Sequence, residues 1–390
     1  MSLPLFALFF AAFGIGTNEF VIAGLLPDVA GDLGITIPDA GYLITLYALG
    51  IAIGGPLTAM ALGRFERKRT LLVLVAVFVI GQAACALAPN FAALAAVRVV
   101  LAFAHGAFFG VAAIVAIGLV PPERRGSAVA LLLAGITVAN ILGVPAGTAI
   151  GNTFGWRATF WAVGILVLLG WLGLAIAVPT MRQAASAPRP RLAQEVGVLG
   201  RQAVFMSFAV IVVAMIGQFS LFTYIAPLLT EVTGVAEGAV PWLLLLFGLG
   251  STVGVLLGGR LADWRLMPTL LAVLLLNAAI YAVIALVIRA PIPMGIAIFV
   301  WGGLAFGFGA PAQARILRAT VDAPNLASPL VPAAFNVGIA LGATIGSLVL
   351  DHGFGYTSLP WIGVVVSLLA LVIALASWSM ERRGGQPALP

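Results

Sequence analysis

The chain has 390 residues, of which 62% are hydrophobic and only 8% are charged, and its formal net charge is +6. Soluble globular proteins carry about 25% charged residues, so this composition excludes an ordinary soluble protein and indicates helices that cross a lipid bilayer. The single cysteine, Cys85, excludes an intrachain disulfide and a cysteine-ligated metal cluster.

Twelve apolar runs follow one another along the chain, and Pro, Gly and charged residues separate them. Each run is long enough to cross the membrane as a helix, so the predicted fold class is an all-α polytopic membrane protein. The first run has no basic segment before it and is expected to be retained as a membrane helix. The runs cover residues 4–26, 40–62, 71–88, 91–119, 127–150, 156–178, 203–229, 239–262, 268–288, 292–317, 328–350 and 357–379.

One connection differs from the others, because residues 179–202 are polar, basic and rich in proline. It divides the runs six and six, which predicts two domains. We expect a first six-helix bundle over 1–180, a cytoplasmic linker over 181–202, a second bundle over 203–380 and a cytoplasmic tail over 381–390.

The basic residues predict the orientation of the helices. If the amino terminus is cytoplasmic, nearly all of the 19 Lys and Arg residues lie on the cytoplasmic side, and only Arg98, Arg157 and Arg289 do not. This bias is the positive-inside pattern, and it predicts that both termini are cytoplasmic. No basic run has interleaved aromatic residues, so a nucleic-acid partner is not expected.

The two halves are related in sequence. GLLPDVAG at 24–31 matches PLLTEVTG at 227–234, and LGVPAG at 142–147 matches LGATIG at 341–346. The matches are about half a chain apart and have the same position within each set of six runs. Parallel six-helix repeats, with a substrate site near the middle of the membrane where the repeats meet, are the layout of one class of transporters.

Several stretches carry a family resemblance. They are GTNEFVIAGLLP at 16–27, RFERKR at 64–69, RVVLAFAHGAFFG at 98–110, VPPERRGSAVA at 120–130 and GITVANILGVPAGT at 135–148. Over essentially its whole length the chain resembles the major facilitator superfamily. Within it, the chain is similar to the twelve-helix proton-coupled drug exporters, in the branch of sugar-, chloramphenicol- and purine-nucleoside-efflux proteins. The resemblance implies a monomer in the bacterial inner membrane that exports drugs or sugars and contributes to antibiotic resistance.

The resemblance also implies gating motifs. In the fifth run, Gly135, Gly143, Pro145 and Gly147 stand at the positions of the family's antiporter motif. The small residues are expected to let helices approach closely, and Pro145 to bend the helix.

The loop after the second run departs from the family pattern. Arg64, Arg67 and Lys68 keep its basic positions, whereas Gly63 stands where the family has an Asp. The second half retains this carboxylate as Asp263 in GRLAD, so an ionic latch is expected at Asp263 and not at Gly63.

Glu19 is the only acid deep within an apolar run. On a helix ending near Pro27 it lies about 12 Å from the outer end, and Arg98 lies about 10 Å deep in the fourth run, so the depths allow an ion pair. His105 follows two turns later on the face of Arg98. Burial disfavours a charged carboxyl group and a nearby guanidinium favours it, so Glu19 is expected to titrate near neutral pH and to carry a proton.

Structural roles remain open for the same three residues. Glu19 and Arg98 can form a permanent ion pair, Arg98 can tie helices together through its five donors, and His105 can bind a backbone carbonyl. Proton coupling is therefore the hypothesis for Glu19, Arg98 and His105.

Neutral polar residues in the apolar runs are candidates for substrate binding or for interhelical hydrogen bonds. The candidates are Asn18, Asn140, Gln218, Asn277 and Asn336. Phe222 stands where the second half repeats the position of Glu19, so a substrate site is expected to lack an acid on that side and to accept a neutral or weakly cationic molecule.

Enzyme classes fit poorly. Two histidines cannot supply an HExxH zinc site, the only lysine follows an arginine and not a glycine, and no G-x-S-x-G is present. No cofactor or metal is expected. The prediction is a secondary transporter that exports a small molecule in exchange for protons. The alternatives are a proton symporter that imports a solute on the same fold and, more remotely, a membrane enzyme.

Overall fold

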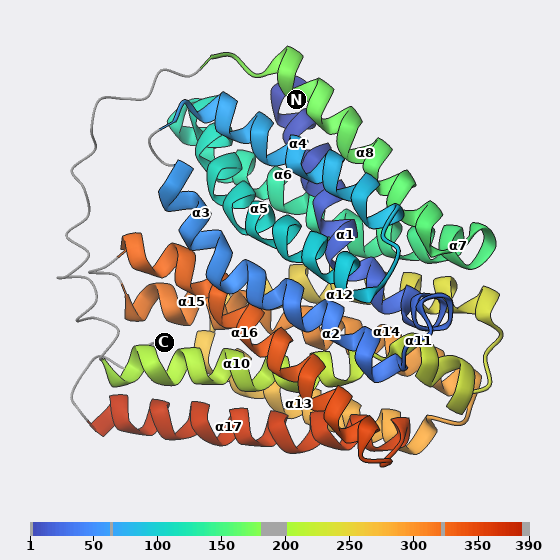
Figure 1. Ribbon diagram of the computed structural model, residues 1–390. Helices are drawn as coiled ribbons and strands as arrows, with labels where there is room; N and C mark the ends of the chain where they lie inside the picture. Colours follow the sequence, from blue (N-terminus) through green and yellow to red (C-terminus); the bar gives the residue numbers. More distant parts are fainter. Residues whose placement is uncertain (1–2, 63–64, 181–200, 321–323, 384–390) are drawn as a thin grey trace. The chain divides into compact units, whose positions relative to one another are not determined.

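The computed structural model describes residues 3–62, 65–180, 201–320 and 324–383, and in this part of the chain every regular element is a helix. Twelve helical spans are long and apolar enough to cross a membrane, as the apolar runs predict (Figure 1). The spans are Leu3–Leu33, Ile37–Leu62, Arg67–Ala86, Phe91–Gly118, Pro122–Phe154, Trp156–Ala177, Gln202–Phe222, Glu237–Trp264, Leu266–Val287, Pro291–Ala319, Val331–Asp351 and Tyr356–Arg382. The predicted fold class is confirmed, whereas the expected linker lies almost wholly outside the described residues.

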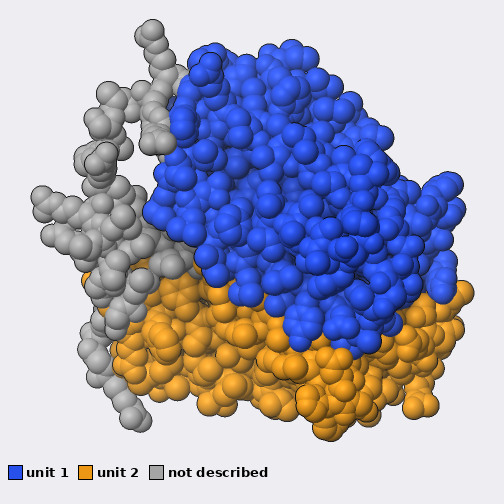
Figure 2. All heavy atoms as spheres, in the orientation of Figure 1, with its two compact units in different colours: residues 1–187, 237–245 blue, residues 188–236, 246–390 orange. Residues whose placement is uncertain are grey.

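The described chain forms two compact units, coloured separately in Figure 2. The first comprises residues 1–187 and 237–245, and the second comprises residues 188–236 and 246–390. Each unit has the helices of one predicted half, except that the start of the eighth span groups with the first unit.

In the first unit, α1 (Leu3–Leu33) is the central helix. It contacts α2 (Ile37–Leu49), α5 (Phe91–Gly118), α6 (Arg125–Val138) and α8 (Trp156–Ala177). Because it is surrounded, most of its side chains are buried, and a polar residue on it therefore faces other helices more often than lipid.

Further helices complete this unit. The second span continues from α2 through a π-helical turn, Gly50–Gly54, into α3 (Gly55–Leu62). The third span, α4 (Arg67–Ala86), packs against α5 and α8. The fifth span continues from α6 through a second π-helical turn, Ala139–Gly143, into α7 (Val144–Phe154).

In the second unit, α10 (Gln202–Phe222) packs along α16 (Pro324–Asp351) and α17 (Leu359–Arg383). The seventh span extends past α10 into α11 (Ile225–Pro227) and a π-helical turn, Leu228–Val232.

The remaining helices of this unit are α12 (Val240–Trp264), α13 (Leu266–Val287), α14 (Pro291–Gly307) and α15 (Gly309–Ala319). Helices α12 and α14 touch backbone to backbone at Gly254, where a Cβ would collide with the carbonyl oxygen of Gly303. Such contacts are typical of small residues between membrane helices. The tenth span consists of α14 and α15, which are separated at Phe308.

One expectation about α1 is wrong. Pro27 predicts an end of the first helix near that residue, but α1 continues through Pro27 to Leu33. A proline removes one backbone donor, and membrane helices tolerate that loss when neighbouring helices hold the segment. Glu19 is therefore 16 residues from Leu3 and 14 from Leu33, close to the middle of the span and not near its outer end.

Candidate functional site

Glu19 lies on the central helix of the first unit with only 14% of its side chain exposed. Carboxylates inside a spanning helix are costly, and they occur where other polar groups or a wet cavity can hold them. The surroundings of Glu19 therefore define the candidate site.

His105 of α5 is the nearest cation-forming group to this carboxylate. Its Nε2 atom lies 3.8 Å from Oε2 of Glu19, which is longer than a hydrogen bond. Its Nδ1 atom lies 3.0 Å from the hydroxyl oxygen of Tyr47 on α2. The ring also lies among the aromatic rings of Tyr47, Phe78 and Phe109. The structure brings the first and fourth spans together at Glu19 and His105, whereas the helix depths in the sequence predicted that Glu19 pairs with Arg98.

A chain of side-chain hydrogen bonds extends this contact across four helices. Gln82 of α4 donates from Nε2 to Oδ1 of Asn18, at 2.9 Å. Asn18 donates from Nδ2 to the hydroxyl oxygen of Tyr47, at 3.0 Å. All four side chains from Gln82 to His105 are buried. No sequence pattern singles out Tyr47 or Gln82, and only the tertiary structure shows that they meet Asn18.

Arg98 of α5 is fully buried beside this chain. Its Nε donates to the backbone oxygen of Leu43 at 3.4 Å, and its guanidinium lies 4.6 Å from the ring centre of Tyr47. The terminal nitrogens, Nη1 and Nη2, have no hydrogen-bond partner among the described residues. Glu19 and Arg98 do not form a direct ion pair in the described structure, since the ion-pair contact of Glu19 is with His105. The two charges belong to one cluster but are not in contact.

Two further candidates bind their own helices. Nδ2 of Asn140 donates to the backbone oxygen of Ile136 at 3.3 Å, and Nδ2 of Asn336 donates to that of Pro332 at 3.0 Å. Asn140 lies on the π-helical turn that packs against α1. Bonding a carbonyl one turn earlier leaves the amide oxygen of each Asn available, so a role in substrate binding stays a prediction.

The other two candidates lie inside the second unit. Gln218 lines a small, mostly apolar pocket, to which Asn277, Tyr281 and Ser367 contribute the other polar side chains. Asn277 also donates from Nδ2 to the backbone oxygens of Val273 and Leu304, at 3.0 and 3.2 Å. A lining that is mostly apolar, with a few uncharged polar groups, suits an uncharged group.

Phe222 belongs to an aromatic cluster in this unit. Its ring centre lies 5.0 Å from that of Phe247 and 6.2 Å from that of Trp301. The second unit therefore has aromatic rings around the position that corresponds to Glu19 in the first.

The glycines of the fifth span bring it onto α1. A Cβ at Gly143 would collide with the side chain of Thr17, and one at Gly135 would lie 2.7 Å from the backbone oxygen of Phe9. Gly147 meets Val21 in the same way, at 2.6 Å, and Pro145 follows the π-helical turn directly. The predicted close approach is therefore present, whereas a gating role stays a prediction.

The loop motif has a local structural explanation. Glu66 caps α4, accepting from the backbone nitrogens of Lys68 and Arg69 at 2.9 and 2.8 Å. A side-chain acceptor at this position satisfies donors that a helix leaves unpaired at its start. Arg67 and Lys68 open the helix, whereas Arg64 lies outside the described residues. Asp263, the expected latch, makes no ion pair with another described residue.

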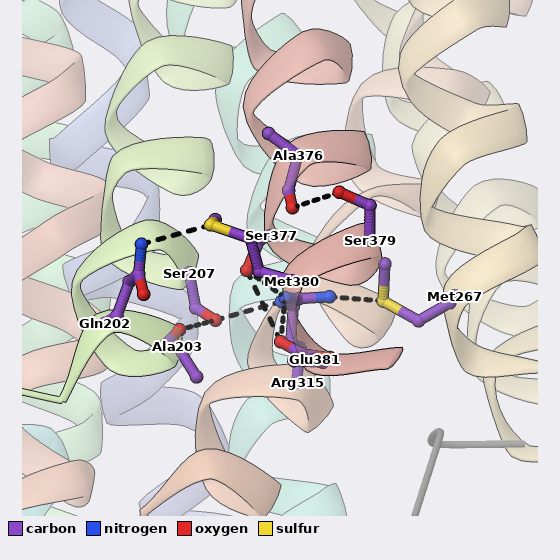
Figure 3. A network of polar contacts seen from close by, with 10 residues as sticks. All are labelled: Gln202, Ala203, Ser207, Met267, Arg315, Ala376, Ser377, Ser379, Met380 and Glu381. Atoms are coloured by element: carbon purple, nitrogen blue, oxygen red, sulfur yellow. Dashed lines mark hydrogen bonds and ion pairs between the residues drawn. The ribbon is translucent and has the colours of Figure 1, made fainter. Parts of the chain in front are cut away.

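A second buried charge, which the sequence analysis assigned only to topology, lies in the second unit (Figure 3). Arg315 of α15 donates from Nη2 to Glu381 and Ser377 of α17, at 2.6 and 2.7 Å. Its Nε donates to Ser207 of α10 at 3.0 Å, and its Nη1 contacts the sulfur of Met267 on α13. The partners come from three other helices far apart in sequence, so no local motif predicts them.

Metal ligation has no support in the described part of the chain, which contains no cluster of three His, Cys, Asp or Glu side chains. The two buried clusters are hydrogen-bonded charges and amides. Such groups can bind, orient and exchange a proton.

The chain belongs to the major facilitator superfamily, whose family model matches residues 8–328 and 207–389. It is 38% identical over 374 residues to the inner membrane transport protein YdhP of Escherichia coli (strain K12), covering 96% of this chain and 95% of that protein. It is 36% identical over 375 residues to the chloramphenicol resistance protein of Streptomyces lividans, covering 96% of each.

Solved structures share the fold at low sequence identity. The D-xylose-proton symporter superposes with a TM-score of 0.74 at 17% identity, covering 94% of this chain and 96% of that one. A bacterial homolog of the human lysosomal transporter Spinster, in an inward-facing and occupied conformation, gives a TM-score of 0.72 at 18% identity, covering 97% and 96%. These likenesses support the twelve-helix transporter fold and leave the substrate to other arguments.

Proposed function

We propose that the protein is a secondary exporter that moves a small molecule out of a bacterial cell in exchange for protons. The observation that carries the proposal is a buried carboxylate, Glu19, in the middle of the first span and within a polar cluster. A transporter needs a group that binds a proton on one side of the membrane and releases it on the other. An ionisable side chain held inside a bundle is the usual means.

Position separates Glu19 from the other described acids. Asp28, Asp32 and Asp263 lie within two turns of the ends of their helices. The remaining acids lie at helix starts, in connections or in terminal turns, and they are Asp39, Glu66, Glu123, Glu231, Glu237, Asp351 and Glu381. Only Glu19 combines mid-span depth with burial and a polar neighbour.

The proposed cycle follows from this position. Glu19 takes up a proton while the site is open to the outside, and protonation removes the charge that the site would otherwise hold. The neutral site favours closure to the outside and opening to the cytoplasm, where proton release and substrate loading alternate. Proton binding can shift the protein between the two access states only if Glu19 binds the proton more tightly in one state than in the other.

The chemistry of the two units suggests the class of substrate. The first unit supplies amide and carboxylate groups near Glu19, whereas the second supplies Gln218 and the aromatic rings around Phe222. We propose a neutral or weakly cationic substrate with an apolar face, because the second unit has aromatic rings and no acid at the position that corresponds to Glu19. The name of the Streptomyces lividans relative makes chloramphenicol the first compound to test, and a sugar and a nucleoside are the other two.

The direction of transport is the decisive experiment. Inside-out vesicles with an acidic interior should accumulate chloramphenicol, D-xylose or inosine against a gradient, and substrate addition should release protons from the vesicles. Vesicles that lack the protein are the control. Accumulation only in right-side-out vesicles with an acidic exterior would instead identify import by symport.

We place the protein in the bacterial inner membrane as a monomer with both termini in the cytoplasm. The basic bias supports this orientation, and the name of the relative YdhP supports the membrane. In a Cys85→Ala background, cysteines in exposed connections test it. Glu123→Cys should be labelled from the cytoplasm and Ala236→Cys from outside, and labelling of both from one side would contradict the orientation.

A further inference from the structure

We infer that Tyr47 and Asn18 hold His105 in a single neutral form, protonated on Nε2, so that its ring donates toward Glu19 and does not itself carry a transported proton. This inference rests on the proposed function only in taking Glu19 as the proton carrier. In this inference Tyr47 and Asn18 are positioning residues. Glu19 takes up and releases the transported proton, and His105 does not.

The amide groups of Gln82 and Asn18 determine which atom donates and which accepts along this series of hydrogen bonds. Asn18 accepts at Oδ1 from Gln82, so its other end, Nδ2, faces Tyr47 and donates to the hydroxyl oxygen at 3.0 Å. Both ends of the Asn18 amide are therefore used within the protein. This moves Asn18 from the candidate substrate ligands to the groups that orient the site.

The hydroxyl of Tyr47 links Asn18 to His105. A phenol has one proton to donate, and the Tyr47 oxygen already accepts from Asn18. Nδ1 of His105, at 3.0 Å, is the acceptor within bonding distance for that proton, and the inference assigns it there. An Nδ1 atom that accepts a hydrogen bond has no proton of its own, so a neutral imidazole then carries its proton on Nε2. That atom lies 3.8 Å from Oε2 of Glu19.

The neighbouring groups oppose a charged His105. An imidazolium would place a second donor against the Tyr47 hydroxyl, and the Arg98 guanidinium already lies over the ring of Tyr47 at 4.6 Å. The titratable and charged groups around the chain are Glu19 from α1, Tyr47 from α2, Cys85 from α4 and Arg98 from α5. Glu19 is the only one of them that can balance a cation. A second positive charge beside Arg98 in a bundle interior would be strongly unfavourable.

The test is a nitrogen NMR measurement on histidine, which needs no substrate. The chain contains two histidines, so in a His352→Gln background the ¹⁵N-histidine signals come from His105 alone. The inference predicts a neutral ring with the proton on Nε2 on both sides of the pH at which transport is half-maximal. An imidazolium signal in that range would overturn it, and so would a neutral ring protonated on Nδ1.

Tyr47→Phe provides the second arm, because it keeps the ring under Arg98 and removes only the hydroxyl. We expect a mixture of the two neutral forms of His105 and a shift of the transport pH profile to higher pH by up to about one unit, since an ionised Glu19 loses its oriented donor. Tyr42→Phe on the same helix is the matched control and should change neither. An unchanged His105 spectrum in Tyr47→Phe would contradict the positioning role.

The two proposals fail in different ways. If Glu19→Gln still drives uphill export, the proton-carrier role of Glu19 fails, while the form of His105 is decided separately by its spectrum. If His105 becomes charged while Glu19→Gln blocks uphill export, only the positioning role of Tyr47 and Asn18 fails.

Discussion

Each unit buries one arginine in its helical bundle, and the two are held in opposite ways. Arg98 in the first unit is 0% exposed and Arg315 in the second is 1% exposed. All three nitrogens of the Arg315 guanidinium contact a partner, including the carboxylate of Glu381. The terminal nitrogens of Arg98 have none among the described residues, and its cation rests on an aromatic ring.

This difference separates structure from function. A buried charge that is fully hydrogen-bonded and ion-paired ties helices together, and removing one partner leaves the other uncompensated. A buried charge with unused donors is costly to keep, and proteins retain such groups mainly at functional sites. We therefore expect Arg315 to act as a structural tie of the second unit and Arg98 to act on the charge of Glu19.

The largest expected effect is that of Arg315→Met on stability. Loss of the guanidinium leaves Glu381, whose side chain is 14% exposed, without a counter-ion and leaves a gap at the fully buried Arg315, which together cost up to about 3–5 kcal/mol. Unfolding in detergent should show this loss, and Arg318→Met, an exposed change on the same helix, should be nearly neutral. The double variant Arg315→Met/Glu381→Met should recover most of the loss. Equal stability of Arg315→Met and Arg318→Met would remove the structural half of the comparison.

Arg98→Leu should change the pH dependence of transport more than stability. Removing the cation disfavours the ionised form of Glu19, so Glu19 keeps its proton to higher pH and the half-maximal pH of driven transport rises by about 1–3 units. Arg98→Lys keeps the charge and should shift the profile less. The measurement is transport against external pH, with unfolding measured in parallel. A severe stability loss with an unchanged pH profile would make Arg98 a tie like Arg315.

The smallest effect is expected at an exposed ion pair, which provides a reference for the stability effects of changing Arg315 and Arg98. Arg157 pairs with Asp32 at the surface of the first unit, where both side chains are more than a third exposed. It also donates from Nη2 to the backbone oxygen of Ala88 at 3.2 Å. Exposed pairs contribute about 0.2–1 kcal/mol, so Arg157→Gln should lower the unfolding free energy by no more than that. A loss as large as that of Arg315→Met would show that the exposure of an arginine does not determine how much it contributes to the free energy of unfolding.

Most of the fold was predictable because hydrophobic length and charge bias are local properties of the sequence. The twelve runs and the resemblance to the superfamily followed from the sequence, whereas the pair predicted for Glu19 was with Arg98 and the structure places His105 there instead. The end of the first helix did not, because Pro27 suggested a break that the surrounding helices tolerate.

The hydrogen-bonded partners were not predictable in the same way. Tyr47 and Gln82 are single polar residues on different helices, and only packing brings them to Asn18. Arg315 looked like one more basic residue near a helix end, and the sequence analysis counted it for topology. Its partners lie on three other helices, so only the tertiary structure distinguishes it from the exposed arginines.

The most direct test of the central claim compares two transport modes of Glu19→Gln in the same vesicles. Glutamine keeps the shape and hydrogen bonds of the side chain but cannot bind and release a proton. We predict that uphill export driven by a pH gradient is lost, while exchange of labelled for unlabelled substrate without a gradient persists. Glu19→Asp, which still titrates, should retain part of the uphill export. If Glu19→Gln exports normally against a concentration gradient, the carboxylate is structural and the proton-carrier account is contradicted.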